Sequence, residues 1–397
     1  MGICFACPLL FEGYVEAIAA MKILVVSNAY KNFASSREIG ELIRAGIHQV
    51  HPTWVVDIVP IADGGAGTVE SLVIASQGEY RVATAFNPAH MPIDVCIGYS
   101  PVQHTAFLDI TDTAGAGKFF TDDWNTIHLS SFGVGVAIRA AAQLGVDRIV
   151  IGLGGSIISD GGLGMAQALG VRFYSLDDLP VHPHNGKCMT CQDLAQVHRI
   201  DMSDVPELIT SIHYTVLSDV DIRLLGPNGQ AYTFARQKRA NETEIGFIES
   251  ALANWNRALG RTFNDDFDVP LAGAAGGLGA GLKAILKGEL KQGIDFVLDN
   301  LSFDARCKDY DLVVTGEGHL DRTTRLKKAC YGIAKRCQAL NKPCFGVFGR
   351  IEEIIDEFLD CSIDASIVSL SSGESPRLFS KRAIVDAASM MCRQIGE

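Results

Sequence analysis

Short apolar runs alternate with amphipathic helical patterns along most of this chain, and this alternation limits the folds open to it. Residues 23–27 (ILVVS) form one apolar run, and residues 36–50 follow with apolar side chains at helical spacing and Ser35 or Ser36 placed as the N-cap. Further strand-like runs lie at 55–61, 148–155, 311–318, 343–349 and 365–370. The pattern is typical of an α/β protein.

Glycine-rich stretches follow several of these runs. Residues 151–170, IGLGGSIISDGGLGMAQALG, contain seven glycines, and six of them, at positions 152 to 164, lie around Asp160. Related stretches at 62–68, 272–279 and 315–321 contain further glycines together with Asp63, Glu317 and Asp321. Glycine is costly to order, so such runs indicate either close packing of backbone or N–H groups that face an anion. Because ligands of α/β sheets bind at the carboxyl ends of strands, we expect several of these turns to meet at one anion site.

Common nucleotide-binding fingerprints are absent. GAGKF at 115–119 lacks the first glycine and the Ser/Thr of a P-loop, and no strand carries a G-x-G-x-x-G that opens a helix. Lys31 and Lys328 follow predicted strand ends and are therefore candidates for contacts with anionic groups. Lys238 and Arg236, in the run FARQKRA, are interpreted as solvated surface charges.

Charge and cysteine usage exclude some classes of protein. The formal net charge of −12, without a long Lys/Arg run to offset it, argues against a nucleic-acid binder. Eleven cysteines without a repeated framework favour reduced thiols and a cytoplasmic protein. Cys188 and Cys191, with His182 and His184 upstream, could bind zinc, but a lone C-x-x-C favours coincidence.

The first twenty residues contain Glu12 and Glu16 and no Lys or Arg, which argues against a secretory signal or a membrane span. We interpret residues 1–20 as an extension outside the fold. No later segment is apolar for long enough to span a bilayer, so no membrane partner is expected.

Six blocks of sequence occur in order and carry a specific resemblance. They are SNAYK (27–31), PIADGGAGT (60–68), GLGGSIISDGGLGMAQALG (152–170), LSDVD (217–221), AGAAGGLG (272–279) and VVTGEGHLD (313–321) followed by Lys327 and Lys328. This series resembles the motifs of the type 1 glycerate kinase family, from Met21 to the C-terminus. The resemblance implies phosphorylation of D-glycerate or a closely related small hydroxy acid, with ATP and Mg²⁺.

The resemblance also implies a fold. A Rossmann-like parallel-sheet domain built from both chain ends is expected at 21–85 and 295–397, with a second α/β domain inserted at 86–294. The expected partners are small molecules, and a homodimer is compatible with the chain.

Residue roles follow from the matched blocks. Asp160 is expected to act as the base or to position the metal, with Asp219 as second choice and Lys31 as a further catalytic residue; Asp160 or Glu317 could bind the metal. The expected substrate- or phosphate-binding residues are Asp63, Gly64, Gly65, Gly154, Gly155, Ser156 and Lys328. The expected nucleotide-binding residues are Gly273, Gly276, Gly277, Gly316, Glu317, Gly318 and Asp321.

Several motif positions depart from the family pattern. Asn28 replaces an Asp, Ile157 and Ile158 replace small residues, and FARQKRA replaces FGPQKGA. His319, Thr323 and Lys327 replace Arg, Gln and Gly. These changes keep open an alternative, a non-catalytic paralogue that binds a small anionic metabolite or nucleotide. The sequence leaves open the acceptor, the hydroxyl that is phosphorylated and the loop that holds the nucleotide.

Overall fold

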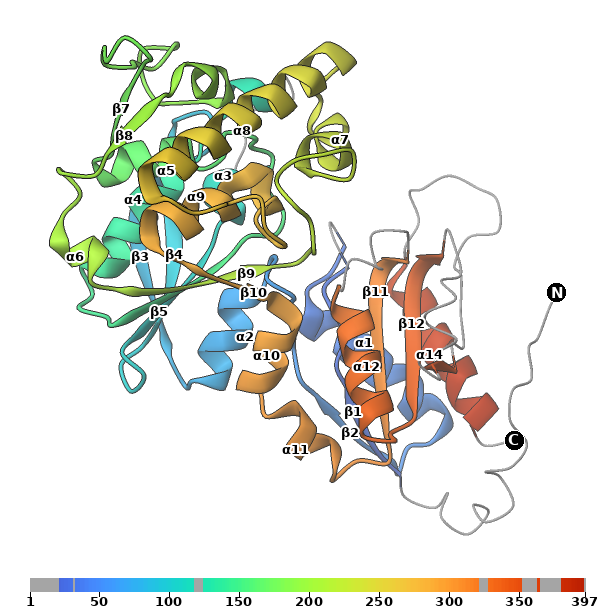
Figure 1. Cartoon of the computed structure of the whole chain (residues 1–397). Coiled ribbons are helices and arrows are strands. Elements are labelled where there is room, and N and C mark those ends of the chain that lie inside the picture. The colour runs from blue at the N-terminus through green and yellow to red at the C-terminus, as the bar shows by residue number, and fades with distance from the viewer. Residues whose placement is uncertain are drawn as a thin grey trace. The chain divides into compact units, whose positions relative to one another are not determined.

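A computed structural model describes residues 21–30, 33–117, 124–320, 328–351, 363–364 and 380–395 (Figure 1). The described residues form two compact units. The first unit contains the chain up to Pro60 together with residues from Ser302–Arg325 and Cys330–Glu397. The second contains Ile61–Leu301 and residues from Leu326–Ala329. A unit built from both chain ends therefore encloses an inserted one in the sequence.

The first unit is built on a parallel sheet. Its strands are β1 (Lys22–Val25), β2 (Val55–Ile58), β11 (Leu312–Leu320), β12 (Cys344–Ile351) and β13 (Ile363–Asp364), in the order β13-β12-β11-β1-β2. Its helices are α1 (Ser36–Val50), α11 (Phe303–Cys307), α12 (Ala329–Ala339) and α14 (Lys381–Ile395). Every strand pair in this sheet is parallel, which confirms the predicted class.

Helices α1 and α14 pack against each other in this unit. The predicted start of α1 is confirmed, since Ser35 caps it in a capping box with Glu38. The apolar face of α1 lies in the core with Ile384 and Met391 of α14. A Cβ on Gly46 would lie 2.3 Å from the Val385 carbonyl oxygen, so glycine is what allows the close approach.

The second unit contains a mixed sheet. Its strands are β3 (Glu79–Phe86), β4 (Pro92–Ser100), β5 (Thr105–Asp109), β6 (Arg148–Gly152), β9 (His213–Ser218) and β10 (Glu289–Gln292), in the order β10-β9-β6-β5-β4-β3. Strands β5, β6, β9 and β10 run parallel, and β3 and β4 form an antiparallel edge. A separate two-stranded sheet pairs β7 (Arg172–Tyr174) with β8 (Arg199–Asp201).

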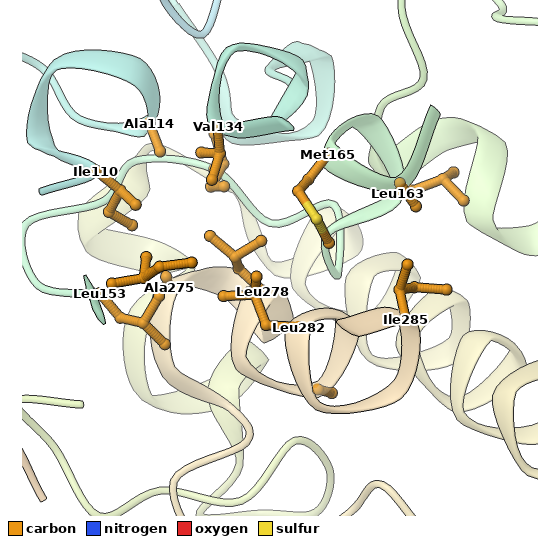
Figure 2. Packing of buried hydrophobic residues seen from close by; sticks show 14 of the residues in the cluster. Ile110, Ala114, Val134, Leu153, Leu163, Met165, Ala275, Leu278, Leu282 and Ile285 are labelled. Carbon is orange, nitrogen blue, oxygen red and sulfur yellow. The ribbon is translucent and has the colours of Figure 1, made fainter. Parts of the chain in front are cut away.

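The described helices of the second unit are α2 (Thr68–Ala75), α3 (Thr111–Ala114), α4 (Phe132–Ala142), α5 (Leu163–Leu169), α6 (Glu207–Thr210), α7 (Gln230–Phe234), α8 (Glu242–Phe263), α9 (Leu278–Leu286) and α10 (Gly293–Asn300). Of these, α3 to α9 contribute buried side chains to one apolar core. Short 3₁₀ segments are η3 (Thr126–His128), η4 (Cys191–Gln196), η5 (Arg236–Lys238) and η6 (Ala274–Gly277). Figure 2 shows Leu163 and Met165 of α5 facing the helix α9 that carries Leu282 and Ile285. Helix α8 begins with a capping box between Asn241 and Glu244, and its apolar stripe is buried.

Two sequence expectations differ from the structure. The boundaries lie after Pro60 and Leu301, and not after residues 85 and 294, because β3 pairs with β4 along its whole length and α10 packs on β9 and β10. The 315–321 stretch is not a turn as far as Leu320, because β11 continues to that residue beside β12. Residues 1–20 and 365–370 lie outside the described residues.

Candidate active site

The glycine-rich loops of the second unit cross at the carboxyl ends of its parallel strands. Asp109 of β5 pairs in register with Gly152 of β6, and Gly152 pairs with Leu217 of β9. The Gly154 N–H donates to the Gly64 carbonyl oxygen over 2.8 Å. A Cβ on Gly154 would lie 2.4 Å from Gly65 Cα. Two backbone segments are therefore in contact here, which only glycine permits.

These loops bring together most of the predicted substrate-binding residues. We name the strand-end cradle by its members: Asp63, Gly64, Gly65, Asp109, Gly154, Gly155, Ser156, Asp219 and Lys238. Gly155 is exposed and Ser156 is half-buried, whereas Gly64, Gly65 and Gly154 are buried. The Gly155–Ser156 turn is thus the glycine-rich part of the cradle that solvent and a ligand can reach.

Asp63 and Lys328, which were both predicted to bind substrate or phosphate, lie close to each other. Asp63 is buried, and its Oδ2 accepts a hydrogen bond from the Ala329 N–H over 3.2 Å. Burial raises the pKa of Asp63, while the Ala329 N–H and the charge of Lys328 oppose that rise. The arrangement pairs an acid with a cation at the start of α12.

Asp219 follows directly on β9 and is half-buried. A Cβ on Gly154 would lie 3.0 Å from Asp219 Oδ2, so this carboxylate lies against the glycine turn. Asp219 also acts electrostatically on the Lys238 ammonium. The geometry therefore gives a partly exposed carboxylate beside a cation, which is an arrangement suited to proton transfer.

Lys238 is not the solvated surface charge that the sequence suggested. Its side chain is buried, with the residue only 5% exposed. Its Nζ donates to Ser156 Oγ over 3.2 Å and to the Ile158 carbonyl oxygen over 2.8 Å. Burial lowers the pKa of Lys238 to about 7, although Asp219 and Asp160 oppose the change. The available signal was that Gln237 and Lys238 keep the family motif in FARQKRA, while Ala235, Arg236 and Arg239 depart from it.

Asp109 is a second residue that the sequence argument missed. It ends β5, and its Oδ1 accepts the Thr111 N–H over 2.8 Å. Burial raises the pKa of Asp109 to about 6, against the hydrogen bonds from Thr111. Its position directly after the apolar run TAFL, at a strand end, was the signal that could have identified it.

Asp160 is placed differently from the expectation for a base. It is fully buried. Its Oδ2 accepts from the Ser131 N–H and the Ser131 hydroxyl, each over 2.7 Å, and from the Gly164 N–H, while Oδ1 accepts from the Gly162 N–H. Burial raises the pKa of Asp160, and these donors oppose the rise. This geometry favours a structural anchor that organises the loop, and several nearby glycines serve to surround it closely.

Gly273, Gly276 and Gly277 pack closely against neighbouring backbone, and Gly276 lies against the loop that contains Asp160. A Cβ on Gly276 would lie 2.1 Å from the Ile158 carbonyl oxygen, and one on Gly273 would lie 2.1 Å from the Arg223 carbonyl oxygen. Gly276 and Gly277 are buried with positive φ. Close packing of backbone accounts for these glycines, and nucleotide contacts from Gly273, Gly276 and Gly277 stay a prediction.

The predicted residues that are described in the first unit lie in a cluster around Tyr30 and Glu317. Glu317 Oε1 accepts a hydrogen bond from Cys330 Sγ over 3.1 Å, and the Tyr30 hydroxyl donates to the Val347 carbonyl oxygen over 2.6 Å. Burial and the charge of Glu317 raise the pKa of Tyr30. Gly316 and Gly318, on either side of Glu317 in β11, lie against Tyr30. Lys31 and Asp321 lie outside the described residues.

Comparison with known proteins assigns the family. The model of the glycerate kinase family matches residues 23–393. The glycerate kinase of Bacillus subtilis is 34% identical over 360 residues, which cover 90% of this chain and 92% of that protein. The glycerate 2-kinase of Escherichia coli is 33% identical over 353 residues, covering 89% and 91%.

A solved structure agrees with these sequence relatives. It is a crystal structure from Salmonella typhimurium whose title refers to glycerate kinase 2, with a TM-score of 0.75 and 30% identity. The match covers 95% of this chain and 97% of that chain. The chain therefore belongs to the glycerate kinase family, and it is a kinase whose phosphoryl acceptor is an alcohol group.

Proposed function

We propose that the protein transfers the γ-phosphoryl group of ATP to a hydroxyl of D-glycerate, or of a closely related small hydroxy acid, to give the phosphorylated acid. The observation that carries this proposal is the buried Lys238 ammonium, which donates a hydrogen bond to Ser156 Oγ and interacts electrostatically with Asp219. Both substrates are anionic, and phosphoryl transfer needs cations and donors fixed in advance around the moving group.

Lys238, Asp219 and Lys328 have different proposed roles in the reaction, which follow from their charge and exposure. Lys238 supplies a positive charge beneath the reachable Gly155–Ser156 turn. Asp219 is the proposed base, because its carboxylate is partly exposed and can accept the proton of the acceptor hydroxyl. Lys328, beside Asp63, is a second proposed contact for an anionic group.

The described residues fit a magnesium ion that arrives with its nucleotide. No group of three or more His, Cys, Asp or Glu side chains within the described ranges is arranged to hold a metal by itself. Mg²⁺ usually takes one or two protein carboxylates together with substrate phosphates. Asp109 would supply such a carboxylate, whereas Asp219 is the proposed base and Asp160 is occupied by four donors. Bound Mg²⁺ would offset phosphate charge.

We also propose that the protein is cytoplasmic. The eight cysteines within the described residues are free thiols, which supports a cytoplasmic protein. Within the same residues, no helix is long and apolar enough to cross a membrane. The relatives named above carry kinase names, and none of them supports the non-catalytic alternative.

The test is ADP release from ATP and Mg²⁺ with D-glycerate, L-glycerate or no acceptor, with the product identified by ³¹P NMR. We expect release that depends on D-glycerate, and we expect Asp219→Asn to reduce it at least 100-fold. Asp204→Asn, an exposed carboxylate paired with Arg172, is the matched control and should keep the rate. Tight binding of ATP and D-glycerate without turnover would instead support a non-catalytic binder.

A further inference from the structure

A cavity of about 820 Å³ in the second unit shares no lining residue with the strand-end cradle. Its walls come from segments far apart in the sequence: Pro88, Ala89, His90, Trp124, Asn125, His128, Leu129, His184, Asn185, Lys187, Cys188, Gln192 and Arg239. Pockets for small molecules commonly measure about 300–1,000 Å³. The cavity is therefore large enough for a metabolite.

The described lining of the cavity is rich in cations although the protein is acidic. Its described lining includes Lys187 and Arg239, three histidines and no Asp or Glu, in a chain whose formal net charge is −12. A local excess of cations in a concave site attracts anions. The three histidines and Cys188 could suggest a metal instead, but no metal-holding group of such side chains occurs in the described parts of the chain.

The His90 ring is a fixed part of this wall. Its Nδ1 is buried and has no hydrogen-bond partner among the described residues. The ring stacks on Phe86, with centroids 4.5 Å apart, and meets the edge of Phe132 at 4.9 Å. The two aromatic contacts hold the His90 ring in place in the wall of the cavity.

Arg239 and Trp124 form a second fixed part of the wall. The guanidinium carbon lies 4.4 Å from the indole centroid, and Arg239 has a left-handed backbone conformation at the end of η5. A guanidinium held on an aromatic face keeps its donors in one plane, which matches the geometry of a carboxylate or a phosphate.

We propose that this cavity is a second ligand site that binds a small organic or phosphorylated anion, with Arg239 and Lys187 pairing with its acid group and His90 contacting its polar edge. The site goes beyond the proposed kinase reaction and does not depend on it. The anion could be the phosphorylated product of this enzyme or an unrelated carboxylate, since both present the same chemistry to Arg239.

The test is calorimetric titration of the full chain, at low salt, with citrate, inorganic pyrophosphate and 3-phosphoglycerate as probes. We expect at least one probe to bind, and Arg239→Gln to weaken its binding at least tenfold. Arg236→Gln, an exposed arginine in the same run, should change it less than twofold. Citrate binding alone would indicate a carboxylate ligand, and preference for 3-phosphoglycerate would indicate the product.

Two further variants distinguish loss of the proposed site from loss of folding and from binding at the strand-end cradle. Lys187→Gln changes an exposed side chain, so it should weaken the same probe without loss of folding even if Arg239→Gln unfolds. Lys238→Met, in the strand-end cradle, should remove any binding of 3-phosphoglycerate at the kinase site and leave the Arg239-dependent binding unchanged. The proposal is overturned if no probe binds, if the Arg236 and Arg239 variants behave alike, or if Lys238→Met abolishes the Arg239-dependent binding. ADP release by the wild type tests the kinase function separately.

Discussion

Lys238 Nζ lies 3.2 Å from Ser156 Oγ, and it is joined to the Ile158 carbonyl oxygen as well. Burying an ammonium group is costly even when it is hydrogen-bonded, because it gives up its hydration. Structures retain such a charge where function requires it, and perturbed lysines are frequent at active sites. This contact is therefore the most informative one in the strand-end cradle.

Lys238→Met tests that interpretation directly. The substitution removes the charge and keeps an unbranched apolar side chain, so the phosphorylation rate should fall by about 10²–10³, the usual loss for one preorganised donor. The free energy of unfolding should fall by no more than about 1–3 kcal/mol, because the buried Ile158 carbonyl oxygen loses its donor while the cost of burying the ammonium group is removed. Steady-state kinetics and urea unfolding measure the two quantities.

Arg236→Gln serves as the control in both measurements, because Arg236 is exposed and pairs with Glu242. It should alter neither the rate nor the stability appreciably. A Lys238→Met enzyme that works at the wild-type rate would remove Lys238 from the site.

The sequence predicted best the features that depend on neighbours in the chain. The starts of α1 and α8 were predictable because Ser35 and Asn241 form capping boxes with residues three positions later. The boundary after Pro60 was not, because it depends on the pairing of β3 with β4. Gly316 and Gly318 suggested a turn, but pairing of β11 with β12 extends the strand through them.

The sequence predicted that the glycine-rich loops of the site meet, but it predicted the burial and contacts of the charged side chains less well. Gly64 and Gly154 meet at the strand ends as expected. A lysine in a polar run looks exposed, and the burial of Lys238 depends on Ser156 and Ile158, about eighty residues earlier. Nor can a sequence distinguish a carboxylate that faces a ligand from Asp160, which is enclosed by donors from Ser131, Gly162 and Gly164.

Asp160→Asn should act first on stability. The amide has one acceptor oxygen and two donor hydrogens, whereas the carboxylate accepts four hydrogen bonds, so buried N–H groups of the loop would lose partners. We expect the free energy of unfolding to fall by about 2–4 kcal/mol. Urea unfolding followed by circular dichroism measures it.

The control for this variant is Asp265→Asn, which removes an exposed carboxylate paired with Lys283 and should cost less than about 1 kcal/mol. If Asp160→Asn were as stable as the wild type and yet inactive, Asp160 would be a catalytic group and its proposed structural role would be wrong.

Asp109 should make stability depend on pH. Its folded-state pKa is raised to about 6, above the ordinary value near 4, so between these values the folded state holds more protons than the unfolded state. The contribution of Asp109 to stability is therefore fully present below pH 4 and is lost as the pH rises through 6. Asp109→Asn should remove this fall, which amounts to about 2–3 kcal/mol at most.

The measurement is the free energy of unfolding at pH 4 to 7 for both proteins. Their difference isolates Asp109 from other titrating groups. Parallel curves across that range would show that the Asp109 carboxyl is not perturbed by the fold.

Gly154→Ala tests whether the backbone contact itself builds the site. The added Cβ would lie 2.4 Å from Gly65 Cα and 3.0 Å from Asp219 Oδ2, so the loop and the carboxylate must move apart. We expect a loss of about 1–3 kcal/mol in the free energy of unfolding and a fall in kcat larger than that loss explains. Gly246→Ala, in α8 with open space around its Cα, should stabilise the protein by up to about 1 kcal/mol and leave kcat unchanged. Equal kcat values for the two variants would mean that the contact of Gly154 with Gly65 and Asp219 is not part of the active site.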